Sequence, residues 1–146
     1  MAVGSLSDIL PKVSIDEVKD WRKLLPKLFA EMIGTMLLTM IGCGSCIEST
    51  PVQYGLCFGI TVATIAQSIG HISGCHINPA VTFGLVFGRK IELLSALLYI
   101  VFQCIGALLG AGLLKAFIAG YKVNNKLITA AGVTKLSDGI GAGQVS

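Results

Sequence analysis

The sequence predicts an all-α membrane protein with three transmembrane helices and one re-entrant half-helix. Of the 146 residues, 53% are hydrophobic and 13% are charged, and the mean hydropathy is +0.79. A soluble domain would carry about 25% charged residues. Three apolar runs each have the length of about 20 residues that crosses a bilayer core. A fourth uncharged stretch is too short to cross the bilayer and too apolar to be a solvated loop.

The chain begins with a polar arm of mixed charge, residues 1–27. This arm lacks the apolar core of a cleaved signal sequence, so we expect the first apolar run to drive insertion. Within the arm, Ser14-Ile15-Asp16-Glu17 resembles a capping signal and predicts a short amphipathic helix.

The three predicted spans are residues 28–47, 52–69 and 93–114. Glu48-Ser49-Thr50-Pro51 is a tight polar break between the first two spans. After the third span the sequence becomes polar and rich in glycine, which predicts a loop-like tail over residues 115–146.

Basic residues set the expected orientation, because loops on the cytoplasmic side carry the excess of Lys and Arg. Seven of them fall on the side of the N-terminal arm, and four fall on the other side. The N-terminus is therefore expected in the cytoplasm and the tail outside. The first group is Lys12, Lys19, Arg22, Lys23, Lys27, Arg89 and Lys90, and the second is Lys115, Lys122, Lys126 and Lys135.

Residues 70–88 must leave from and return to the same side of the membrane, because the spans on either side already account for two crossings. The 11 residues from Asn78 to Gly88 would make a helix of about 16 Å, roughly half the hydrocarbon thickness. Asn78 can cap its first turn and Pro79 suits its first position. Since non-helical backbone at this depth must be buried in protein or line a watery cavity, the stretch predicts a pore element.

These residues resemble a known family. The sequence Gly70-His71-Ile72-Ser73-Gly74, followed by His76-Ile77-Asn78-Pro79-Ala80-Val81-Thr82, is similar to the first signature loop of the aquaporin (major intrinsic protein) family. The resemblance extends over residues 27 to about 114 and is that of the N-terminal half of a water-selective aquaporin. It includes Ala30-Glu31-Met32-Ile33-Gly34-Thr35, Phe58-Gly59 with Ala63-Thr64, and Tyr99 to Gly106.

The resemblance implies a set of pore-lining residues. Asn78 would donate its amide hydrogens to a passing water, and the carbonyl groups of Gly74, Cys75 and His76 would form steps for a single file of waters. Phe58 would be one wall of an outer constriction that favours water over glycerol.

Other residues would hold the loop in place. By resemblance, Glu31 and Gln103 would brace it through hydrogen bonds to its backbone, and the half-helix that begins at Pro79 and Ala80 would turn its positive end toward the pore. We expect His71 to bond to the loop backbone too. No carboxylate or thiol ligands at zinc spacing surround the two histidines, so no metal site is predicted.

The expected function is passive water transport, without enzymatic activity, a cofactor or nucleic-acid binding. The lipid bilayer, most simply the plasma membrane, is the expected surrounding, and the resemblance implies a homotetramer for the full-length form. A pore of this kind needs two inverted half-helices, whereas this sequence has one Asn-Pro-Ala and lacks the family's constriction Arg. We therefore expect the chain alone not to conduct. Two alternatives remain open, a short form that regulates full-length subunits and half of a glycerol channel.

The cysteines and glycines have simpler interpretations. An odd number of cysteines in apolar runs is not a disulfide framework, and Cys43-x-x-Cys46 has no second pair beside it to indicate a redox or metal motif. The small-residue pairs are expected to let helices approach closely. They are Gly55 with Gly59, Gly84 with Gly88, and Gly106 with Gly110.

Overall fold

The computed structural model describes residues 16–47, 49–120, 122–123 and 126–127, which form helices followed by one short hairpin ladder. Three of the helices have the length and hydropathy of membrane spans, which confirms the predicted all-α membrane fold. In chain order the elements are α1 (Asp16–Lys19), α2 (Trp21–Ser45), α3 (Pro51–Ser73), α4 (Pro79–Phe87), α5 (Leu93–Phe117), β1 (Lys122–Val123) and β2 (Lys126–Leu127). The expectations for residues 1–15 and 128–146 lie outside the described residues.

The spans are longer than their apolar runs. Helix α2 begins at Trp21, and α3 continues through Ser73 rather than stopping at Ile69. Helix α3 ends where Gly74 adopts a φ of 89°, a left-handed conformation that glycine reaches without steric cost and that commonly ends helices. Because hydropathy marks only the apolar part of a helix, the sequence missed this polar last turn. The loop toward α4 therefore begins at Gly74 rather than at Gly70.

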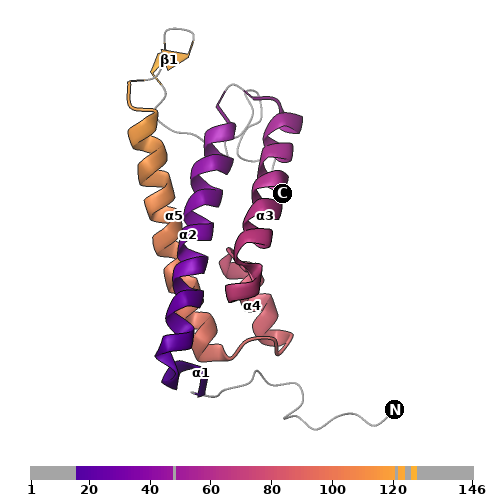
Figure 1. Ribbon diagram of the computed structural model, residues 1–146. Coiled ribbons are helices and arrows are strands. Elements are labelled where there is room, and N and C mark those ends of the chain that lie inside the picture. Colours follow the sequence, from indigo (N-terminus) through magenta and orange to yellow (C-terminus); the bar gives the residue numbers. More distant parts are fainter. Residues whose placement is uncertain (1–15, 48, 121, 124–125, 128–146) are drawn as a thin grey trace, which may run out of the picture.

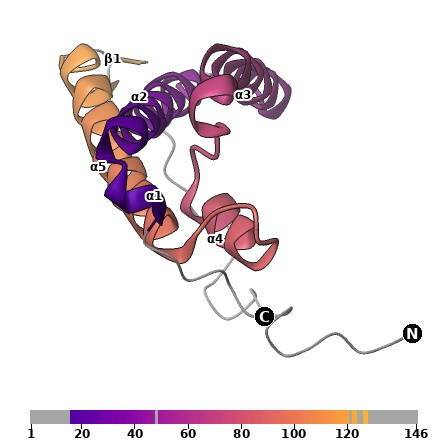
Figure 2. The same cartoon turned by 60° about the horizontal axis from the view of Figure 1, so that its bottom comes forward.

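Helix α2 lies between α5 and α3 (Figure 1) and packs against both. The short α4 packs against α5 and lies near the end of the bundle that carries α1, as the rotated view in Figure 2 shows. Within the described part of the chain, the backbones of α3 and α5 do not approach each other closely, and the hydrogen bond from the Tyr99 hydroxyl to the Ser73 carbonyl oxygen links these two helices. Helix α2 is thus the central support of the fold.

Glycines bring α2 and α5 close together. A Cβ atom on Gly106 would strike the carbonyl group of Met32, and one on Gly110 would strike that of Met36. The close approach predicted for this glycine pair is confirmed. By contrast, no other described segment lies within 4 Å of the position that a Cβ atom would take on Gly55, Gly59 or Gly84, so among the described residues the packing prediction is wrong for these three.

A capping box begins α3. The Thr50 side chain accepts a hydrogen bond from the backbone N–H of Gln53 at 3.4 Å, and Gln53 Oε1 accepts one from the N–H of Thr50 at 2.8 Å. Pro51 then occupies the first helical position, where its missing N–H is harmless.

Replacing Thr50 with Ala should lower the free energy of unfolding by about 1 kcal/mol, because the orphan N–H group of Gln53 loses its acceptor. The measurement is unfolding in mixed micelles of increasing SDS content, followed by helical circular dichroism. Thr64→Ala, at an exposed position inside α3, is the matched control and should change stability by less than about 0.5 kcal/mol. Equal losses of stability in both variants would show that the Thr50 cap does not stabilise α3.

Candidate functional site

The loop between α3 and α4 has an unusual backbone. Gly74, Cys75 and Ile77 have φ angles of 89°, 51° and 40°. A left-handed conformation is rare for a β-branched residue and costs about 1–3 kcal/mol, yet Ile77 adopts it while only 5% exposed. Such a loop persists only if its surroundings fix it.

Glu31 on α2 provides that restraint. Its side chain is fully buried, and its carboxylate accepts four hydrogen bonds. Oε1 accepts from the Ser73 hydroxyl at 2.6 Å and from the backbone N–H of His76 at 2.9 Å. Oε2 accepts from the backbone N–H of Ile77 at 2.6 Å and from Gln103 Nε2 at 2.8 Å. Charge-assisted bonds of this kind are about twice as strong as neutral ones, so the carboxylate can hold Ile77 in its strained conformation.

Gln103 on α5 links this carboxylate to α4. Its Nε2 donates to Glu31 and, at 2.9 Å, to Thr82 Oγ1. The Thr82 hydroxyl lies 3.0 Å from the carbonyl oxygen of Asn78, one turn earlier. The family resemblance predicts that Gln103 bonds to the loop backbone. That detail is wrong, because the carboxylate of Glu31 stands between the amide and the loop.

Tyr99, one turn before Gln103, provides a second support. Its hydroxyl donates to the Ser73 carbonyl oxygen at 3.0 Å, and its ring lies 5.1 Å from that of His76. His76 Nδ1 is also 3.2 Å from Thr82 Oγ1. Ser73, Thr82 and Tyr99 were missed as site residues. A spacing of four between Tyr99 and Gln103, which places both on one face of a helix, is the signal that could have found Tyr99.

Asn78 begins α4 as predicted from its sequence. Its Oδ1 accepts the backbone N–H of Ala80 at 2.8 Å, and Pro79 occupies the first position of the helix. Since the oxygen of the amide faces the helix, its nitrogen points away from it. The side chain is exposed, and no hydrogen bond from this nitrogen exists within the described residues. Two amide hydrogens are thus available at the positive end of α4.

Two expected site residues lie elsewhere. His71 is exposed on the last turn of α3, and the described part of the chain offers it no hydrogen bond to the loop. Phe58 is half-buried near the opposite end of α3, where its ring fills the space above Gly42 of α2. Gly74, Cys75, His76 and Asn78, by contrast, are brought together in the loop.

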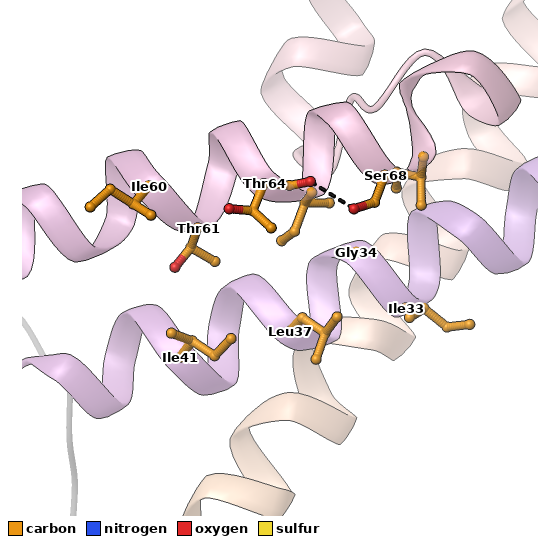
Figure 3. Close-up of a pocket in the computed structure, with 10 residues that line it drawn as sticks. Ile33, Gly34, Leu37, Ile41, Ile60, Thr61, Thr64 and Ser68 are labelled. Atoms are coloured by element: carbon orange, nitrogen blue, oxygen red, sulfur yellow. Dashed lines mark hydrogen bonds between the residues drawn. The ribbon is translucent and has the colours of Figure 1, made fainter.

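A groove of about 230 Å³ runs between α2 and α3, and Gly34, which lines it, lies beside the Ile77 side chain of the loop. Figure 3 shows residues that line the groove from the two helices, Ile33, Leu37 and Ile41 from α2 and Ile60, Thr61 and Thr64 from α3. The polar Ser68 hydroxyl in it is already used, since it donates to the Thr64 carbonyl oxygen at 2.8 Å. None of the expected pore residues lines this groove, so it is not the site.

Three apolar spans and a capped half-helix, joined by a loop that a buried carboxylate restrains, define an integral multi-pass membrane protein with a re-entrant element. Comparison with known proteins identifies the family within this class. The family model of the major intrinsic protein matches residues 17–145. The chain therefore belongs to the major intrinsic protein family, whose members are channels and not enzymes.

Similar proteins come from animals and bacteria. The chain is 37% identical to human aquaporin-1 over 136 residues, which are 85% of this chain and 47% of that protein. It is 45% identical to aquaporin FA-CHIP of Pelophylax lessonae over 93 residues, 64% of this chain and 32% of the relative. It is 44% identical to aquaporin Z of Rhodopseudomonas palustris over 102 residues, 64% of this chain and 42% of the relative. The chain thus spans less than half the length of these relatives.

Proposed function

We propose that this chain supplies one half of a channel for water. The observation that carries the proposal is the free amide nitrogen of Asn78 at the N-terminal end of α4, held there by a cap and by the Glu31 network. Asn78 donates hydrogen bonds to a passing water. The carbonyl groups of Gly74, Cys75 and His76 accept hydrogen bonds from the waters next to them. Similarity to proteins named aquaporin supports water as the permeant.

The chain alone does not conduct. A pore of this type is lined by two half-helices that meet at the midplane from opposite sides, and the described residues supply one, α4. Two copies inserted in the same direction would present α4 from the same side. The charge bias favours an N-terminus in the cytoplasm. In our proposal the membrane is the plasma membrane, and the complete channel assembles there as a homotetramer with Phe58 in its outer constriction.

Reconstitution into liposomes tests this proposal. The chain alone should leave osmotic water permeability at the level of protein-free liposomes, whereas adding the separately expressed second half of human aquaporin-1 should raise it. A rise with the chain alone would refute the half-pore. Glycerol passage through the paired halves would favour the glycerol alternative. A fall in the permeability of a full-length channel on addition of this chain would favour a regulatory short form.

Asn78→Asp separates the donor role from the cap. An aspartate retains the acceptor for the Ala80 N–H but lacks the amide hydrogens, so water permeability of the paired halves should fall roughly tenfold, the value of one lost hydrogen bond. Stopped-flow light scattering measures this fall. Gln67→Glu, exposed on α3, is the matched amide-to-acid control and should keep the wild-type permeability. An unchanged rate in Asn78→Asp would exclude Asn78 as the donor.

A further inference from the structure

The C-terminal end of α2 carries two thiols on one side, one in its last turn and one at its C-cap. Cys43 and Cys46 are three residues apart, and both are half-buried. Helix geometry places Cα atoms three residues apart at about 5 Å. Disulfides form between residues whose Cα atoms are about 4.4–6.8 Å apart. The Cα atoms of this pair therefore lie within the range that a disulfide spans, whereas Cβ atoms three residues apart on a helix are about 5–6 Å apart and must approach to about 4 Å for the bond to close.

The end of the helix has the freedom that closure of the bond needs. The N–H of Cys46 donates to the carbonyl oxygen of Cys43, and that of Ile47 to Gly44, both at 3.2 Å. Cys46 is the residue that caps the helix, so it has no following turn to hold it. Its Sγ lies 3.5 Å from the carbonyl oxygen of Gly42, which places the sulfur back along the helix, toward the turn that contains Cys43.

We propose that Cys43 and Cys46 form a reversible intramolecular disulfide by exchange with a small disulfide such as oxidised glutathione. The thiolate of one cysteine attacks glutathione disulfide, forms a mixed disulfide and releases one glutathione thiolate. The second cysteine, as its thiolate, attacks the mixed disulfide at the protein sulfur and releases the other glutathione. The two protein thiols lose two electrons and two protons, and one glutathione disulfide becomes two glutathione molecules.

The position of the pair suits this chemistry. In the orientation proposed above, the end of α2 lies near the outer surface of the membrane, where disulfides persist. Oxidation would take the Cys46 thiol away from the Gly42 carbonyl oxygen. The Ser45 hydroxyl, 2.6 Å from that oxygen, would then be the side chain that donates to it. Gly42 also lies directly beneath the ring of Phe58. The redox state of the pair therefore changes one hydrogen bond to the carbonyl group of Gly42, the residue that contacts the Phe58 ring.

Thiol counting in membranes that contain the full chain tests the proposal without any transport assay. The membranes are equilibrated with oxidised glutathione, quenched with acid, denatured and labelled with a maleimide polymer. The number of labelled cysteines should fall from five to three and return to five after reduction with dithiothreitol. A peptide that contains both Cys43 and Cys46 should become two hydrogen masses lighter.

Single variants identify the pair. Cys57→Ser, which leaves the pair intact, should still lose two labels. Cys43→Ser and Cys46→Ser should each give no internal disulfide, and the remaining thiol should carry glutathione, which mass spectrometry detects. Five labels in the oxidised wild type would overturn the proposal. So would a disulfide that uses Cys57, Cys75 or Cys104, or one that joins two copies of the chain.

Discussion

Glu31→Gln should cause a large loss of stability, although it hardly changes the shape of the side chain. Each carboxylate oxygen accepts two hydrogen bonds, one of them from a backbone N–H, that of His76 for Oε1 and that of Ile77 for Oε2. An amide must turn its NH₂ group toward one of the two. Whichever oxygen this NH₂ group replaces, it then faces a backbone N–H, that of His76 or that of Ile77, and two donors point at each other.

The expected loss is about 2–3 kcal/mol, the cost of one buried unsatisfied donor together with part of the strain at Ile77. Glu31→Ala, which removes both oxygens, should lose more. Unfolding by SDS in mixed micelles measures both values. Asp20→Asn makes the same chemical change at an exposed carboxylate and should have a much smaller effect, because solvent-exposed ion pairs contribute little to stability. Similar losses at positions 20 and 31 would show that the network contributes little.

Gly106→Ala is the second variant with a large expected effect. The added methyl group would meet the carbonyl group of Met32, and a backbone cannot rotate aside as a flexible side chain can. Helices α2 and α5 would have to separate, and Gln103, one turn earlier on α5, would move away from Glu31. Overpacking of this kind costs about 1–3 kcal/mol, and the loss of the Gln103 hydrogen bond adds to it.

Gly59→Ala is the control, and its effect should have the opposite sign. Gly59 lies inside α3 with open space beside it, and alanine stabilises a helix interior by about 0.5–1 kcal/mol relative to glycine. The same SDS titration compares the two variants. If both behave alike, helix propensity rather than the close approach of α2 to α5 decides the effect of a methyl group.

The sequence predicted the parts of this molecule that follow from local chemistry. The three spans follow from the length of their apolar runs. The start of α4 follows from Asn78, which caps the helix, and from Pro79, whose ring suits the first helical position. The last turn of α3 was missed, because His71 and Ser73 are polar and yet helical. The partners of Gln103 were also missed, since resemblance names a residue but not the atom it bonds to. The Tyr99–Ser73 hydrogen bond depends on how two helices are placed, which no local pattern encodes.

The partners of Glu31 arrive late during synthesis of the chain. Ser73, His76 and Ile77 follow it by 42, 45 and 46 residues, and Gln103 follows it by 72. At roughly 5–20 residues per second, the ribosome needs several seconds to supply them. During that interval α2 contains a carboxyl group without partners, which is costly in a membrane helix. The first span therefore enters the bilayer as an unfinished structure, and translation of α5 completes it.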